Sequence, residues 1–172
     1  MKTALTGTPG TGKTTISKML SDGYGLEVVD LNEVIRAHGY YTGWDENRHC
    51  LIVDIEALNA HPFSDGLVLE GHLSHHLPVD RVVVLRTDPD VLRARLKEKG
   101  FSDNKIRENF EAEILDVILV EALEVHRNNV YEVDSTGTPS ISARLVWEIT
   151  QGQGLERFAP GQYDWTGYLN DA

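Results

Sequence analysis

A glycine-rich segment near the start of the chain has the residue pattern of a phosphate-binding loop. Residues 7–15 read GTPGTGKTT and contain the complete pattern G-x-x-x-x-G-K-[ST] between an apolar run and a helical segment. Glycines in such a loop let backbone N–H groups turn onto phosphate oxygens, and the following helix presents its positive end to the same anion. Lys13 can reach the β- and γ-phosphates of a nucleotide, and the Thr14 hydroxyl can hold Mg²⁺.

An acidic residue normally helps to hold the metal in a site of this kind, at the end of a neighbouring buried strand. Glu70 ends the apolar run 67–69 and is the first candidate, and Asp30, which follows the apolar run 26–29, is the alternative. Thr14 and Glu70 together would leave several water molecules on Mg²⁺, as that ion prefers. We therefore predict that Thr14 and Glu70 hold the metal.

Several histidines follow Glu70 closely. His72 lies two residues beyond it, where the ring would point into the space shared by the transferred phosphate and its acceptor. Such a histidine can act in acid–base chemistry or position a water molecule, and the alternative is an ordinary surface histidine. Other side chains that could ligate a metal are His49, Cys50, His75 and His76. Their spacing matches no closed structural zinc pattern, so we do not predict a zinc site.

Basic residues gather on both sides of Gly100. They are Arg93, Arg95, Lys97 and Lys99 before it, and Lys105 and Arg107 after it. A loop between two helices, with cations at both ends, can close over a triphosphate and neutralise the charge of the transferred group. Solvated helix faces carry similar residues, and we prefer Lys99 because it is nearest to the loop. Arg36, in the helix after the second strand, can bind an acceptor phosphate as a bidentate fork.

Five short apolar runs have the pattern of strands covered on both faces, and helical segments lie between them. The predicted strands are 3–6, 26–29, 67–69, 82–85 and 130–133, and the predicted helices include 13–20, 89–99, 105–127 and 139–151. Residues 31–60 are predicted to be helical at both ends, with a polar, aromatic loop over 39–49. This alternation predicts an α/β fold with a five-stranded, mainly parallel sheet and helices on both faces.

Two of the predicted helices have an apolar face at helical spacing. In the helix 105–127 this face consists of Ile106, Phe110, Ile114, Val117 and Ile118. In the last helix it consists of Ile141, Leu145 and Ile149. Residues 153–172 form a tail with Gly, Pro and aromatic residues, which we expect to pack against its own domain or, as an alternative, to bind a partner.

The length of 172 residues favours one domain, here residues 1–152, and the composition is that of a soluble globular protein. No apolar run is long enough for a membrane helix, and a single cysteine fits a reducing cytoplasm. The 27 acidic residues outnumber the 16 basic ones, which gives a net charge of -11. A surface of that sign repels nucleic acid, so we expect no strong direct RNA binding.

Four segments, in this order and spacing, resemble the adenylate kinase isoenzyme 6 family. They are GTPGTGKTT, EGH at 70–72, VLRTD at 84–88, and LKEKGF-SDNKI from 96 to 106. The likeness runs from Met1 to about Gln151. It implies a nucleoside monophosphate (NMP) kinase fold with a short lid, broad NMP kinase activity and ATPase activity. It also implies a role late in maturation of the small ribosomal subunit, through transient contact with a ribosomal protein of the subunit platform.

Site residues follow from this resemblance by position. The implied ATP-binding residues are Gly10, Gly12, Lys13, Thr14, Thr15 and Lys99. The resemblance also implies an NMP-binding segment over about 30–54, a lid over about 98–108, and a modified Walker B feature at Glu70 and His72. Some relatives carry Asp in place of Glu70 and Arg in place of Lys99. A lysine lacks the planar fork of arginine, so a weaker lid clamp is expected.

Three functions are compatible with these residues. The first is transfer of the γ-phosphoryl group of ATP to an NMP, with AMP as the first acceptor to test, together with ATP hydrolysis. The second is a kinase for another small metabolite. The third is a nucleotide-gated assembly factor in which hydrolysis resets a binding surface. An acceptor phosphate is already anionic, so its transfer requires positioning and charge neutralisation more than a base.

Overall fold

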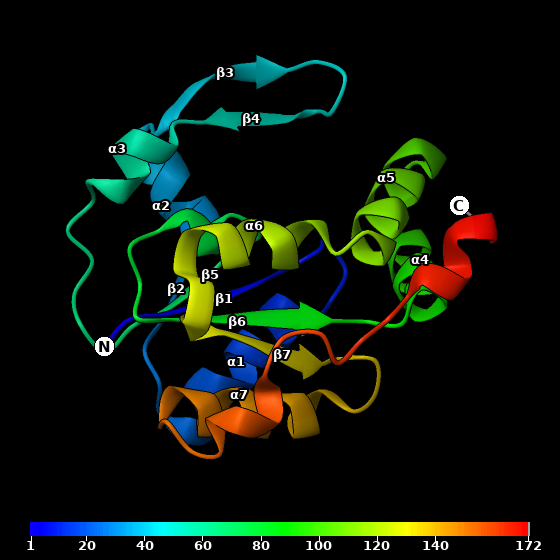
Figure 1. The fold of residues 1–172 in the computed structure, drawn as a ribbon. Coiled ribbons are helices and arrows are strands. Elements are labelled where there is room, and N and C mark those ends of the chain that lie inside the picture. Colours follow the sequence, from blue (N-terminus) through cyan, green and yellow to red (C-terminus); the bar gives the residue numbers. More distant parts are fainter. Residues whose placement is uncertain (172) are drawn as a thin grey trace.

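A five-stranded sheet forms the centre of the computed structural model, which describes residues 1–171 (Figure 1). Its strands are β1 (Thr3–Gly7), β2 (Val28–Asp30), β5 (Val68–Glu70), β6 (Arg81–Arg86) and β7 (Val130–Asp134). They stand in the order β2-β5-β1-β6-β7, and each neighbouring pair is parallel. The prediction of an α/β P-loop fold around a mainly parallel sheet is therefore confirmed.

Helices cover both faces of this sheet. Figure 1 shows α1 (Lys13–Tyr24) and α7 (Pro139–Thr150) on one face and α6 (Val117–His126) on the other. Leu5 of β1 and Val83 of β6 pack in the core on the side of α1 and α7, whereas Ala4, Val82 and Val84 pack toward α6. Because successive residues of a strand point to opposite faces, a strand covered on both faces is apolar throughout.

Six further elements lie outside this layered core. They are α2 (Leu31–His38), β3 (Tyr41–Asp45), β4 (Cys50–Val53), α3 (Ile55–Asn59), α4 (Pro89–Glu98) and α5 (Asp103–Ile114). Residues 1–171 also contain four short 3-10 segments, namely η1 (Ser74–His76), η2 (Arg127–Asn129), η3 (Leu155–Phe158) and η4 (Thr166–Asp171). None of the helices that the structure describes is long and apolar enough to cross a membrane.

The prediction of a loop over residues 39–49 is wrong, because most of this segment belongs to the antiparallel hairpin β3–β4. Leu51 and Val53 of β4 pack against the core beneath α2 and α3, which gives the hairpin one anchored side. At its tip the Asp45 carboxylate accepts hydrogen bonds from the backbone N–H groups of Asn47 and Arg48. Such a side-chain-stabilised turn is encoded by polar residues and resembles a loop in the sequence.

The predicted continuous helix over 105–127 is also wrong. The chain forms α5 and α6 instead, with a break at Asp116, whose φ of 55° is in the left-handed region. The Asp116 carboxylate pairs with the guanidinium of Arg86, which holds this break in place. After the break the apolar face turns, so that Phe110 is buried, whereas Val117 is 36% exposed.

In α7 the predicted apolar face differs in part from the observed one. Ile141 is 54% exposed, whereas the buried side chains of this helix are those of Ser142, Ala143, Val146 and Ile149. The buried face includes small residues because α7 packs closely against α1. Of the three residues predicted for this face, Ile149 is buried and Leu145 packs against the same core, so the prediction is wrong for Ile141 alone.

Most of the tail lies on its own domain. Phe158 of η3 is buried in the core that includes α7, and the backbone N–H groups of Gly161 and Gln162 donate to the Glu132 carboxylate. Farther along, the Tyr168 hydroxyl donates to the Asp88 carboxylate over 2.9 Å. These contacts are those of a tail that packs against its own domain, the first of the two roles considered.

Candidate active site

The P-loop, residues 7–15, joins the end of β1 to the start of α1. Gly10 has a φ of 95°, and a Cβ atom at this position would lie 2.8 Å from Cδ1 of Leu92, so only glycine fits here. Gly12 also has a positive φ, and it begins α1 without a side chain that caps the helix. The first N–H groups of α1 are therefore able to donate to a bound anion.

The Lys13 ammonium folds back over this loop. Its Nζ donates to the carbonyl oxygens of Gly7 and Thr8, over 2.8 and 3.1 Å. Burial lowers the pKa of Lys13 to about 8, against the opposing charge of Glu70 and with the help of the charge on Lys99. A phosphate at the loop would favour the protonated form, because it adds negative charge near Nζ.

The two acidic candidates lie side by side. The strand register pairs Asp30 of β2 with Glu70 of β5. Glu70 is only 6% exposed, and burial raises its pKa, against the charge of Lys13 and with the help of Asp30. Asp30 also accepts a hydrogen bond from the N–H of Asn32 over 2.8 Å, which caps α2.

These donors fit a magnesium ion. Two carboxylates that share a site repel each other, and a divalent cation removes that repulsion. Asp30 and Glu70 supply carboxylate oxygens, and the exposed Thr14 begins the neighbouring helix with a hydroxyl. Oxygen ligands of this kind are the ones Mg²⁺ prefers.

His72 follows β5 and is exposed to the cavity in front of the sheet. The protein atoms around the cavity partly desolvate the ring, and this desolvation, together with the charges of Lys13 and His76, lowers the pKa of His72 to about 4. The ring is therefore neutral at physiological pH. A neutral imidazole can accept a hydrogen bond from a water molecule, which a charged one cannot do.

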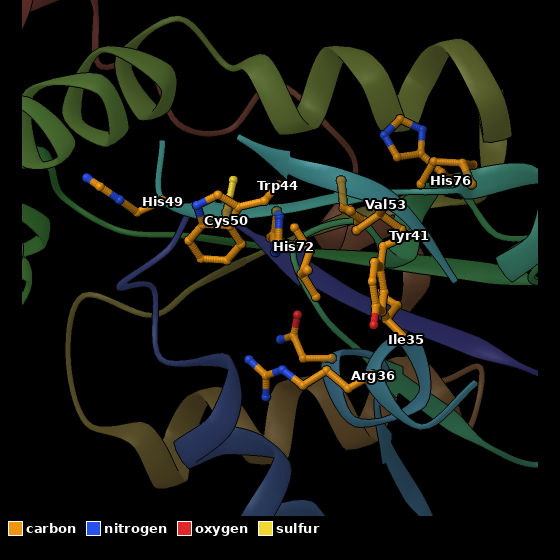
Figure 2. A pocket seen from close by; sticks show the side chains of 13 residues that line it. Ile35, Arg36, Tyr41, Trp44, His49, Cys50, Val53, His72 and His76 are labelled. Atoms are coloured by element: carbon orange, nitrogen blue, oxygen red, sulfur yellow. The ribbon is translucent and has the colours of Figure 1, made fainter. Parts of the chain in front are cut away.

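This cavity, of about 650 Å³, lies between the hairpin and the end of β5 (Figure 2). Figure 2 shows Arg36 from α2 on one side of His72 and Trp44 from β3 on the other. Arg36 is exposed and has no ion pair with any of residues 1–171. The structure thus brings Arg36 and His72 to one cavity, with aromatic walls from Tyr41 and Trp44.

A smaller cavity, of about 180 Å³, opens beside the P-loop. Its lining includes Gly10, Gly12, Thr15, Arg95, Lys99 and Ser135. Lys99 ends α4, and its charge acts on both Lys13 and Glu70. The sequence did not distinguish Arg95 from the other basic residues near Gly100. In the structure, Nη2 of Arg95 donates to the Ser135 and Thr136 carbonyls over 2.8 and 3.0 Å, and these hydrogen bonds hold the wall of the cavity in place.

Two of the other basic residues near Gly100 make contacts outside the cavity beside the P-loop. The guanidinium of Arg93 lies 3.8 Å from the ring centre of Phe110, and Arg107 pairs with Glu111 over 2.8 Å on the exposed face of α5. The two halves of the predicted cation cluster are therefore not equivalent. Of these cations, Arg95 and Lys99 are the two in the lining of the smaller cavity.

A buried network beneath the P-loop was missed by the sequence reasoning. The Glu113 carboxylate of α5 accepts hydrogen bonds from the Thr8 hydroxyl over 2.6 Å, from Nε of Arg86 over 3.0 Å and from the N–H of Thr87 over 3.1 Å. Arg86 also pairs with Asp116 and Glu132, and these carboxylates raise its pKa although burial opposes them. An arginine at the end of a buried strand is the signal that could have indicated such partners.

Comparisons with known proteins place this site in a family. Residues 4–116 match the family model described as "AAA domain", which includes the P-loop. A protein from Natronomonas pharaonis with the name "Putative adenylate kinase" is 44% identical over 98% of this chain and 100% of its own length. Proteins of the same name from Methanothermobacter thermautotrophicus and Archaeoglobus fulgidus are 46% and 43% identical, over 96% and 99% of this chain and 97% and 95% of theirs.

These relatives align over almost the whole chain, well beyond the P-loop that many unrelated nucleotide-binding proteins share. The resemblance stated from four short segments is therefore confirmed. The chain belongs to this family of archaeal adenylate kinase-like proteins.

Proposed function

We propose that the protein transfers the γ-phosphoryl group of ATP to a nucleoside monophosphate, with Mg²⁺, and that it also hydrolyses ATP. One observation carries this proposal: Gly10, Gly12 and Thr15 of the P-loop line one cavity together with Lys99, Arg36 and His72 line another, and the charge of Lys13 acts on His72. A phosphate-binding loop whose lysine acts on a separate acceptor cavity is what a direct phosphoryl transfer requires. The names of the relatives support a nucleotide kinase.

The residues at the donor side have distinct roles in this proposal. The N–H groups at the start of α1, together with Gly10, Gly12 and Thr15, hold the phosphates of ATP. Lys13 leaves the two loop carbonyls to neutralise the charge that develops on the transferred group, and Lys99 adds charge from the lid. Thr14 and Glu70 would hold Mg²⁺, which would supply positive charge to the terminal phosphates.

The acceptor side explains why an NMP is favoured over an uncharged metabolite. Arg36 is an unpaired fork that matches a phosphate monoester, and Tyr41 and Trp44 line the same cavity with flat aromatic rings. A nucleobase has a π-face that stacks on such rings. An NMP combines both features, and we name AMP as the first acceptor to test.

Hydrolysis uses the same donor site with water as the acceptor. Unlike a phosphate, water has to be oriented and has to lose a proton. His72 is neutral and faces the acceptor cavity, so it is the group that we assign to that water.

A coupled assay of ADP production, with Mg²⁺ and with each NMP or none, tests this function. We expect ADP production that depends on AMP. Lys13→Ala should abolish it, and Arg36→Ala should raise the KM for AMP. Loss of a charge aimed at the transferring group costs several kcal/mol, about 10²-fold in rate or more. A Lys13→Ala protein within about tenfold of the wild-type rate would contradict the assignment of the P-loop.

A cellular role in late maturation of the small ribosomal subunit is a separate part of the proposal, supported by the family resemblance. The net charge of -11 disfavours direct RNA binding but suits a basic ribosomal protein of the platform. Binding of that protein and of naked rRNA should be titrated at matched salt, with ADP and with a non-hydrolysable ATP analogue. Tight protein binding that depends on the nucleotide is expected. Nucleotide-independent binding would leave a metabolic kinase as the better account.

A further inference from the structure

A second group of ligating side chains lies behind His72, where the chain after β5 meets α6. His75 and His76 belong to η1, and Glu121 belongs to α6. Their ligating atoms all lie within 4.8 Å of one another. The sequence analysis named His75 and His76 among the possible metal ligands but not Glu121, which is 45 positions farther along the chain than His76.

The distances are close to those of a coordination shell. Nε2 of His75 lies 3.0 Å from Oε2 of Glu121, and Nε2 of His76 lies 3.9 Å from the same oxygen. In a tetrahedral zinc site with bonds of about 2.0–2.1 Å, neighbouring ligand atoms are about 3.3 Å apart. The two separations from Glu121 lie on either side of that value, and rotation of the partly exposed side chains of His76 and Glu121 would close the shell around an ion.

The buried histidine of this group is held as a metal ligand would be. Nδ1 of His75 lies 3.0 Å from the Thr6 hydroxyl, and that hydroxyl is within 3.3 Å of the His72 carbonyl oxygen, to which it can donate. Nε2 of His75 also forms a hydrogen bond of 3.0 Å with the Glu121 carboxylate, in which the nitrogen donates. A metal ion would take the place of that proton, and Nδ1–H of His75 would then donate to the Thr6 hydroxyl. A hydrogen bond on the far nitrogen fixes the tautomer of a metal-bound histidine in this way.

The surroundings keep the site accessible and its backbone fixed. His126 donates from Nε2 to the His75 carbonyl over 2.7 Å, which fixes the backbone of η1. His76 and Glu121 are 28% and 41% exposed, which gives an ion a route from solvent. Figure 2 shows His76 beside the helix that carries Glu121.

We propose that His75, His76 and Glu121 form a binding site for a divalent transition metal of the zinc class. Two imidazoles and one carboxylate are a ligand set that suits Zn²⁺, and a water molecule would complete the tetrahedron. The ion would tie the segment that carries His72 to α6. This inference does not rest on the proposed kinase function, and the site is distinct from that of the Mg²⁺ at the P-loop, which uses oxygen donors alone.

Titration calorimetry with Zn²⁺ on the full chain tests the site, in excess Mg²⁺ so that oxygen-rich sites are filled. We expect one equivalent of Zn²⁺ on the wild type. His76→Ala and Glu121→Gln each remove a proposed ligand from a partly exposed position. Each should lower the affinity for Zn²⁺ by more than about 100-fold, which exceeds the 10–100-fold typical of changes to residues that support the ligands. Thr6→Val removes such a supporting residue and should lower the affinity by about 10–100-fold.

His49→Ala is the matched control, because it removes an exposed histidine outside the cluster and should leave Zn²⁺ affinity unchanged. The absorption spectrum of bound Co²⁺ gives a second readout: we expect the d–d bands of a tetrahedral site, which His76→Ala removes. Circular dichroism confirms that each variant is folded. The proposal is overturned if the wild type binds no stoichiometric Zn²⁺, or if His76→Ala and Glu121→Gln bind it as tightly as the wild type.

Discussion

Replacing Glu113 should reveal how strongly the P-loop depends on the helix beside it. The Glu113 carboxylate accepts three hydrogen bonds, from the Thr8 hydroxyl, from Nε of Arg86 and from the backbone N–H of Thr87. Removing one partner of a buried ion pair costs about 3–5 kcal/mol. Arg86 retains Glu132 and Asp116, so we expect the lower limit, about 3 kcal/mol, for Glu113→Ala. For a chain of this length that corresponds to a decrease in Tm of about 6–12 °C.

Glu113→Gln tests the role of the negative charge, because the variant keeps the shape of the side chain. The amide oxygen can still accept from Arg86 and Thr87, but the amide nitrogen cannot accept from the Thr8 hydroxyl. We expect a loss of about 1–2 kcal/mol in the free energy of unfolding. Because Thr8 belongs to the P-loop, this variant should also raise the KM for ATP more than the KM for AMP.

Glu111→Ala is the control for both variants. It lies on the same helix and pairs with Arg107 over 2.8 Å, but on the exposed face, where such pairs contribute less than about 1 kcal/mol. Urea unfolding followed by tryptophan fluorescence gives the free energies. If Glu113→Ala and Glu111→Ala differed by less than about 0.5 kcal/mol, the network would not be holding the loop, and the reasoning from burial would fail.

Three further predictions concern single side chains. His72→Ala should reduce ATP hydrolysis more than AMP phosphorylation, because only water needs orienting; equal losses in the two rates would indicate a structural role. Because the pKa of Lys13 is about 8, its positive charge in the free protein is lost as the pH rises above 8, and the Kd for ATP should then increase by up to about tenfold per pH unit. A Kd for ATP that does not change up to about pH 9.5 would contradict this reasoning. Tyr168→Phe should lower the free energy of unfolding by about 1 kcal/mol through loss of the bond to Asp88, and an unchanged urea midpoint would show that this end of the tail carries no stability.

The donor side was predictable because its residues are linked to local backbone geometry. The P-loop needs glycines at fixed positions and a lysine within one turn, so the motif specifies its own conformation. Strands buried on both faces are apolar throughout, and the acid that ends such a run, Glu70, must lie at the carboxyl edge of the sheet. Asp30 could be named as an alternative for the same reason, and the register now places it beside Glu70.

The network around Glu113 and the hairpin could not be predicted in this way. Glu113 meets Thr8 across 105 positions of sequence, and nothing in the local pattern of either segment distinguishes a buried carboxylate from a solvated one. The break at Asp116 depends on its contact with Arg86, a tertiary interaction that outweighs the helical periodicity on both sides. The hairpin depends on burial of Leu51 and Val53 under neighbouring helices, which is likewise invisible in a short window.

The electrostatic environment links Lys13 on the donor side of the site to His72 on the acceptor side. Lys13 and His72 both have lowered pKa values, to about 8 and about 4, because desolvation disfavours their charged forms. Lys13 nevertheless stays mostly protonated at neutral pH, and a bound phosphate would raise its pKa and keep the ammonium charged at higher pH. The charge of Lys13 also acts on His72, which therefore remains neutral and can accept a hydrogen bond. The same sheet edge thus keeps a cation for the phosphate and a neutral acceptor for water, because the two groups have pKa values on opposite sides of neutrality.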